Sequence, residues 1–247
     1  MNKFSILTPS FNSGKYLERA IQSVLDQNYT NWEHIVMDGG STDNTIEVLN
    51  KYPHIIWKSE KDKGQSDAMN KAFDLATGDI IVYLNADDEF KPNVFLQIVE
   101  EFNSIEAREN RLIIADLEIV NAQQQSYIAK PSDKIDDILN PYKLQFPYNP
   151  VSYFYDKDLQ KQIGKFPSNF HYAMDYWFLL RIYSKAVVKH IDLVAGVFHN
   201  YDNKTSDTEK SENEVLDILI HFLRVKNPFT FFLHPYWLKA IKKRYRL

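Results

Sequence analysis

The chain has 247 residues, 44% of them hydrophobic and 25% charged, which is the composition of an ordinary globular protein. This composition excludes a collagen-like repeat, a coiled coil or a disordered tail as the main structure. Lys and Arg number 29 against 33 Asp and Glu, for a net charge of −4, so we expect no nucleic-acid partner. Cys is absent, which excludes disulfides, a thiolate zinc site and a cysteine nucleophile.

The first residues, Met1 to Leu7, lack a long apolar run, so we expect no secretory signal. No apolar run reaches the roughly 18 residues that a membrane span needs. Together with the absence of Cys, this predicts a cytoplasmic protein.

The first hundred residues predict strands that alternate with helices. Apolar, strand-like runs occur at residues 4–7, 34–37, 54–57 and 80–84. Helices with one apolar face follow each of them, and the third is expected to end at Gly78, the usual kind of residue after a helix C-terminus. A fourth helix is expected to open after Pro92.

This alternation predicts an α/β fold whose parallel strands end at a common edge. Three polar segments directly follow predicted strands: residues 8–12, 38–43 and 85–88. Because ligands gather where parallel strands present their carboxyl ends, we expect these segments to converge in space.

The second half of the chain is less regular. Strands are predicted at 112–116, around Ile128 and at 194–198, with a Gln-rich turn at 123–125 and a helix at 175–185. Several prolines between Pro131 and Pro150 indicate loops. A final helix follows the polar stretch 200–213, so we divide the chain into a domain of residues 1–205 and a helical extension of residues 206–247.

Asp87 and Asp88 follow the most strand-like segment of the chain. Carboxylates at such a strand end suit a hard divalent cation, Mg²⁺ or Mn²⁺, which would neutralise a diphosphate leaving group. The alternative is that Asn85 to Asp88 form an ordinary turn and cap the next helix.

The three polar segments, read in order, resemble the motifs of family 2 glycosyltransferases. They are Thr8–Asn12, Asp38–Asp43 and Asn85–Asp88, and the segments Glu60–Ala72 and Ala76–Asp79 resemble the same family. The similarity is dense over about the first hundred residues and continues weakly to about residue 200. It implies a GT-A-like, Rossmann-type mixed sheet flanked by helices, and transfer of a sugar from a nucleotide-diphosphate donor, commonly a UDP-sugar, with inversion.

The resemblance also implies which residues bind the donor nucleotide. They are Thr8, Pro9, Ser10, Asn12, Asp38, Asp67, Asn85 and Ala86. Asp38 has a chemical reason for this role, because a carboxylate can accept a hydrogen bond from the imide N–H of uracil. The competing interpretation of Asp38 is a turn residue at the entry of a helix.

Asp87 matches the metal-binding aspartate of the family's Asp-x-Asp motif, with Asn85 in place of the first Asp. That departure removes one negative charge, so binding of Mn²⁺ or Mg²⁺ would depend more on Asp88 and a further ligand. His199 is a candidate for that ligand, although a single His near a strand end is often structural.

Asp175 stands where the family places its catalytic carboxylate, as the second member of a Glu-Asp pair whose first position is Met174 here. An inverting transfer needs a base that takes the proton of the acceptor hydroxyl. The alternative is that Asp175 caps the following helix.

The C-terminal residues 227–247 combine an aromatic stretch with a basic flank. This pattern suits the surface of an anionic membrane leaflet, and therefore a glycan or lipid-linked acceptor and a peripheral location on the inner face of the cytoplasmic membrane. A core-packing tail with a solvated basic end is an equal alternative.

Two other functions fit parts of the pattern. A sugar nucleotidyltransferase would need a glycine-rich, basic loop after the first strand, where this chain has only Gly14 and Lys15. A non-catalytic nucleotide-sugar-binding scaffold of polysaccharide assembly would share the donor site but lack turnover.

Overall fold

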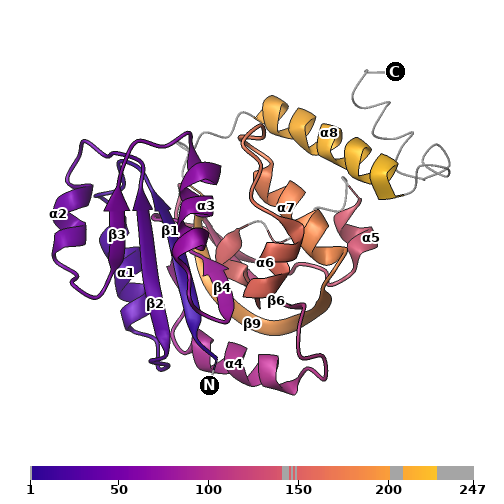
Figure 1. Cartoon of the computed structure of the whole chain (residues 1–247), viewed down its shortest axis with the longest axis horizontal. Helices are drawn as coiled ribbons and strands as arrows, with labels where there is room; N and C mark the ends of the chain where they lie inside the picture. Colours follow the sequence, from indigo (N-terminus) through magenta and orange to yellow (C-terminus); the bar gives the residue numbers. More distant parts are fainter. Residues whose placement is uncertain (1, 141–144, 146, 148, 201–207, 227–247) are drawn as a thin grey trace.

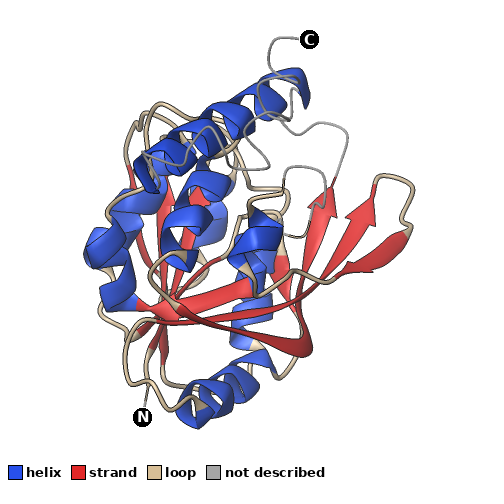
Figure 2. Ribbon diagram, turned by 90° about the vertical axis from the view of Figure 1, so that its right-hand side faces the viewer, coloured by secondary structure: helices blue, strands red, loops and turns tan. Residues whose placement is uncertain are grey.

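The protein is a mixed α/β structure built on one nine-stranded sheet (Figures 1 and 2). The computed structural model describes residues 2–140, 145, 147, 149–200 and 208–226. The main strand order is β3-β2-β1-β4-β8-β6-β9-β5, with β7 paired to β6. The predicted mixed sheet flanked by helices is confirmed.

Four parallel strands from the first half of the chain form one side of the sheet. They are β1 (Phe4–Ser10), β2 (Trp32–Asp38), β3 (Ile56–Ser59) and β4 (Ile80–Tyr83). The helices that connect them are α1 (Leu17–Leu25), α2 (Thr45–Asn50) and α3 (Gln65–Leu75). All of these elements were predicted, with shifts of a few residues at their ends.

The other side of the sheet mixes parallel and antiparallel pairs. Its strands are β5 (Glu89–Phe90), β6 (Arg111–Asn121), β7 (Ser126–Ala129), β8 (Tyr153–Asp156) and β9 (Val187–Asn200). Its helical segments are α4 (Val94–Ser104), α5 (Ile135–Ile138), the 3₁₀ turn η1 (Pro150–Ser152), α6 (Lys157–Ile163), α7 (Met174–Tyr183) and α8 (Thr208–Lys226). The strand β9 is long and strongly curved (Figure 1).

The sheet is buried on both faces, because successive strand residues point into two different apolar clusters. Leu7, Ile81 and Ile114 pack with helices α3, α6, α7 and α8 on one face. Their immediate neighbours Ile6, Val82 and Ile113 pack with α1 and α4 on the other face. This two-sided burial explains why these strands read as continuous apolar runs in the sequence.

Gly78 does not end helix α3, which corrects the prediction made from the sequence. The helix ends at Leu75, and Gly78 lies beyond it with a backbone angle outside the left-handed region. A Cβ atom at Gly78 would lie 2.6 Å from the backbone oxygen of Lys3 and 2.7 Å from Oγ of Ser5. Glycine is therefore needed for close approach to β1, not for a helix cap.

Candidate functional site

The polar segments that follow β1, β2 and β4 lie at one edge of the sheet, as predicted. Ser10 at the end of β1 pairs with Asp38 at the end of β2, and Leu7 of β1 pairs with Tyr83 of β4. The segments that follow are therefore neighbours, although almost 80 residues separate the first from the last.

Asn12 holds the first two segments together. It adopts a left-handed backbone conformation with φ of 48°, which Asn tolerates better than most residues. Its backbone N–H donates to Oγ of Ser41 at 2.7 Å, and its Oδ1 accepts from the N–H of Thr42 at 2.9 Å. Asn12 thus fixes the β1 loop against the β2 loop.

The Asp38 carboxylate organises the β2 loop and is almost fully buried, with 1% of its surface exposed. Its Oδ2 accepts from the N–H groups of Gly40 and Ser41 at 3.1 and 2.9 Å and from the Ser59 hydroxyl at 2.6 Å. The Ser41 hydroxyl donates to Oδ1. Asp38 is thus a turn residue of the β2 loop. To contact a nucleotide base as well, its oxygens would have to accept a further hydrogen bond beside these four.

The end of β1 has two buried hydroxyls and one exposed aromatic ring. Thr8 Oγ1 lies 2.9 Å from Nε2 of His34, whose pKa burial lowers to about 3, so that imidazole is neutral. Ser10 Oγ is buried without a hydrogen-bond partner in the described chain.

Phe11, the aromatic residue that follows Ser10, is 62% exposed. Phe11 is not among the site residues predicted from the sequence, although its place between Ser10 and Asn12 is a usable signal. Pro9, the remaining predicted residue on this strand, pairs with Met37.

Helix α3 begins beside the β4 loop. Gln65 Nε2 donates to Oδ1 of Asn85 at 3.1 Å. Burial raises the pKa of Asp67, but the Lys71 ammonium at 3.1 Å and the backbone N–H of Lys63 outweigh it, so the pKa of Asp67 lies below its usual range. Ala86 packs its side chain into an apolar cluster with Leu17 and therefore faces away from the loop surface.

Asp88 is a fully buried carboxylate that connects three segments of the chain. Its Oδ2 accepts from the side-chain amides of Asn85 and Asn149, at 3.0 and 2.6 Å. Its Oδ1 accepts from the backbone N–H of His199 at 3.0 Å. Both oxygens are therefore engaged within the protein, which is the arrangement of a structural carboxylate.

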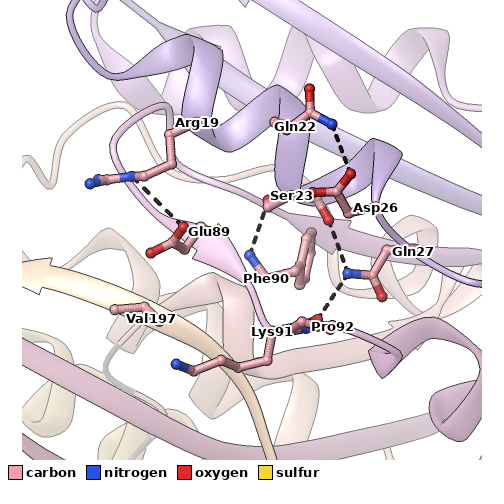
Figure 3. A pocket seen from close by; sticks show the side chains of 10 residues that line it. All are labelled: Arg19, Gln22, Ser23, Asp26, Gln27, Glu89, Phe90, Lys91, Pro92 and Val197. Carbon is pink, nitrogen blue, oxygen red and sulfur yellow. Dashed lines mark hydrogen bonds and ion pairs between the residues drawn. The ribbon is translucent and has the colours of Figure 1, made fainter.

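The Asp87 loop is supported by Arg19 of α1. The Arg19 Nη2 donates to the backbone oxygen of Asp87 at 2.5 Å, and its Nε lies 4.0 Å from Glu89 Oε2. Beside this contact is a cavity of about 290 Å³, lined by α1, β5 and Val197 of β9 (Figure 3). None of the predicted donor or metal residues lines that cavity.

His199 lies near the Asp87 loop with its imidazole in a hydrogen bond. The Nε2 atom lies 3.0 Å from Glu89 Oε1. Burial lowers the pKa of His199, and the Arg19 charge acts in the same direction, whereas Glu89 and Asp87 oppose them. The imidazole is thus oriented by Glu89 and lies within electrostatic reach of Asp87.

These residues fit a divalent cation in part. Within the described part of the chain, no three His, Asp or Glu side chains are grouped closely enough to hold an ion. Mg²⁺ is commonly held by one or two carboxylates together with substrate phosphates. Asp87, with His199 beside it, fits such a shared site, whereas the engaged oxygens of Asp88 do not.

Asp175 lies in the first turn of α7, next to α3. The Ser66 hydroxyl of α3 donates to Sδ of Met174 at 2.8 Å, which brings the start of α7 to the start of α3. The Oδ1 of Asp175 is buried and has no hydrogen-bond partner among the described residues. Burial raises the pKa of this carboxyl to about 6. An ion at neutral pH with an unused acceptor atom is suited to take a proton.

The fold and the polar strand ends define a GT-A-like protein, and the comparisons with known proteins agree. The model of glycosyl transferase family 2 matches residues 5–191. The chain therefore belongs to glycosyl transferase family 2.

Relatives by sequence carry several glycosyltransferase names. A PGL/p-HBAD biosynthesis glycosyltransferase of Mycobacterium bovis is 26% identical over 80% of this chain and 77% of its own length. The chondroitin synthase of Escherichia coli is 35% identical over 40% of this chain and 15% of its own length. In several other relatives the match spans about a third of their length.

Solved structures share the fold. S. aureus TarS in complex with UDP-GlcNAc is 19% identical, with a TM-score of 0.68 over 98% of this chain and 80% of that one. The mannosyltransferase PcManGT of Pyrobaculum calidifontis, in complex with GDP-Man and Mn²⁺, is 15% identical, with a TM-score of 0.62 over 99% of this chain and 69% of that one.

The predicted membrane-contacting segment, residues 227–247, lies outside the described residues. Among the helices that are described, none combines the length and apolar character needed to cross a membrane.

Proposed function

We propose that this chain transfers a sugar from a nucleoside-diphosphate donor, a UDP-sugar in the first instance, to an acceptor hydroxyl with inversion at the anomeric carbon. The observation that carries the proposal is the chain of contacts along one sheet edge. One set of contacts links Asp38 through Ser41 to Asn12. The other links Asn85 to Gln65 of α3, and the next residue, Ser66, to Met174, the chain neighbour of Asp175.

The β1 and β2 loops supply the nucleotide end of the proposed site. Phe11 offers an exposed ring on which a base can stack, a contact that contributes about 1–3 kcal/mol per base in other proteins. The Ser10 hydroxyl, which has no hydrogen-bond partner in the described part of the chain, and the Asp38 loop lie beside it. These groups support the binding of a nucleoside.

The diphosphate would lie over the Asp87 loop. A cation bound there by Asp87, together with the donor's phosphate oxygens and His199, would supply charge neutralisation for the leaving group. Arg19 and Asp88 hold the loop in place through the Asp87 backbone oxygen and the Asn85 amide.

Asp175 is the proposed base. The acceptor oxygen would form a bond to the anomeric carbon while the bond from that carbon to the diphosphate oxygen breaks. The acceptor proton would pass to the Asp175 carboxylate, and the electron pair of the broken bond would leave with the nucleoside diphosphate. The unused Oδ1 atom supports this role, since no internal hydrogen bond in the described chain competes for it.

The acceptor is proposed to be a growing glycan or a lipid-linked sugar of cell-surface polysaccharide synthesis. The support is that relatives are named for chondroitin and for PGL/p-HBAD biosynthesis. Peripheral contact with the cytoplasmic membrane through residues 227–247 belongs to the same proposal.

The test is nucleoside diphosphate release from a panel of UDP- and GDP-sugars, measured with and without Mn²⁺. We expect turnover of at least one donor, and a loss of about 100-fold or more in Asp87→Ala. Asp136→Ala, which removes an exposed carboxylate of α5, is the matched control and should retain activity. Donor binding without release from any sugar would instead identify a non-catalytic binding protein.

A further inference from the structure

The loop before α7 is held by a carboxylate from a distant helix. Glu214 of α8 accepts three backbone hydrogen bonds from consecutive residues. Its Oε1 lies 3.1 Å from the nitrogen of His171, and its Oε2 lies 2.8 Å and 2.9 Å from those of Tyr172 and Ala173. Hydrogen bonds from N–H groups to an ionised carboxylate are about twice as strong as those between neutral groups.

These bonds fix the segment that leads into α7, whose own cap position offers no side-chain acceptor. The first N–H groups of a helix have no partner within it, and a side chain at the cap position usually accepts from one of them. In α7 that position is Ala173, which has no side-chain acceptor. Glu214 engages the N–H of Ala173 and those of the two residues before it, and places a negative charge at the positive end of the helix.

Helix α8 packs against α7, which places the Glu214 carboxylate at the start of α7. It runs across α7 in Figure 1, and its buried residues belong to the same apolar cluster as Met174 and Tyr176 of α7. The buried residues of α8 are Leu216, Ile218, Leu219 and Leu223. The start of α7 is thus held both by Glu214 of α8 and by the Ser66 hydroxyl of α3, which donates to Met174.

We propose that Glu214 is a positioning residue for Asp175, which lies two residues after the last N–H that Glu214 binds. This inference rests on the proposed role of Asp175 as the base. By fixing the backbone at 171–173, Glu214 sets where the first turn of α7 begins and so where the Asp175 carboxylate lies. A misplacement of about 1 Å at a reacting group can cost on the order of 100-fold in rate.

The experiment compares the full chain with Glu214→Gln and Glu214→Ala, using a donor that the wild type turns over. Gln keeps one side-chain oxygen for the three N–H groups, whereas Ala keeps none. We expect kcat to fall about 10-fold in the Gln variant and about 100-fold in the Ala variant, with the KM for the donor within about 2-fold of wild type. Glu100→Gln makes the same chemical change at an exposed position of α4 and should leave both constants unchanged.

A second measurement reports on the contact without relying on activity. Hydrogen–deuterium exchange of a peptide covering residues 168–176 should accelerate about 10-fold or more in Glu214→Ala, because the N–H groups of 171–173 lose their acceptor. Unchanged exchange would overturn the contact between Glu214 and the backbone of residues 171–173. Unchanged kcat, or a KM that rises in parallel with the fall in kcat, would overturn the positioning role.

The outcomes separate this inference from the proposed function. Absence of turnover by the wild type with every donor would overturn the proposed function, and the positioning role with it. Turnover by the wild type together with full activity of Glu214→Ala would overturn the positioning role alone.

Discussion

Asp175 combines a carboxylate oxygen that has no hydrogen-bond partner among the described residues with a pKa that burial raises to about 6. A base must be ionised to accept a proton, so the transfer rate should increase about tenfold per pH unit below pH 6 and level off above pH 7. The measurement is kcat/KM against pH at a fixed concentration of Mn²⁺. A rate that stays level down to pH 4.5 would contradict the assignment.

The same raised pKa predicts an effect on stability. The folded chain binds the Asp175 proton more tightly than the unfolded chain, so stability is lost as pH rises from about 4 through 6. Asp175→Asn removes this cost, and its melting temperature at pH 7.5 should exceed that of the wild type while turnover is lost. Calorimetry of both proteins at pH 4 and pH 7.5 is the check, with the difference confined to the higher pH.

Asn85, which stands in place of the first Asp of the family's Asp-x-Asp pattern, contacts two side chains. Its amide donates to the buried Asp88 carboxylate at 3.0 Å and faces Gln65 with its oxygen. Asn85→Asp would place two carboxylates in contact and replace a hydrogen bond by like-charge repulsion. We expect a loss of about 1–3 kcal/mol in the free energy of unfolding, measured by urea denaturation at pH 7. A gain in stability in Asn85→Asp would show that the Asp88 carboxylate does not need an amide donor at position 85.

At the scale of elements, one buried ion pair joins β6 to the end of β8. Arg111 donates to both oxygens of Asp156, from Nε at 3.0 Å and Nη2 at 2.8 Å, and to the Phe102 backbone oxygen at 2.9 Å. Arg111→Ala leaves Asp156 buried without its charge partner, so the free energy of unfolding should fall by about 3–5 kcal/mol. The exposed pair of Lys161 and Asp158 provides the control. Lys161→Ala should change the free energy of unfolding by about 0.5 kcal/mol or less.

The elements of the first half could be predicted, and several of the second half could not. Residues 80–84 form a continuous apolar run between a helix and a polar turn, and β4 lies there. The strand β8 was missed because its four residues follow a proline-rich stretch and pair with β4 and β6, which are distant in sequence. The strand β5 has only two residues and depends on β9 for its pairing.

The candidate site, like the fold, could be predicted from the sequence only in part. The convergence of the three polar segments followed from strand order alone, and the register confirms it. The roles of Arg19 and Glu214 were not predictable, since both act through backbone groups of segments remote in sequence. No residue pattern marks such a contact before the tertiary structure places the two ends together.

At the scale of the whole molecule, Glu33 connects the N-terminal strand with the turn before β4. Its burial raises the pKa, but hydrogen bonds from Lys3, Ser5 and Thr77 outweigh it and lower the pKa to about 2. The lowered pKa means that ionised Glu33 contributes about 3 kcal/mol to the free energy of unfolding. This contribution is complete above pH 4.5 and is lost as pH falls from 4.5 to 2.

Urea denaturation between pH 2 and pH 6 tests this contribution. Glu33→Gln should be less stable than the wild type at pH 6, and the two proteins should approach one another near pH 2. Glu100→Gln, an exposed position on α4, serves as the control and should follow the wild type throughout. A constant difference across the pH range would contradict the titration of Glu33.

One uninterrupted sheet carries the strands of the proposed nucleotide site and the strands that support helix α7. Because β4, β8, β6 and β9 are hydrogen-bonded in sequence across its middle, the two halves cannot bend apart about a hinge without breaking that ladder. The sheet would then fix the distance between the proposed donor site and Asp175. Substrates of different size would have to be accommodated by changes in loop conformation and side-chain rotamers.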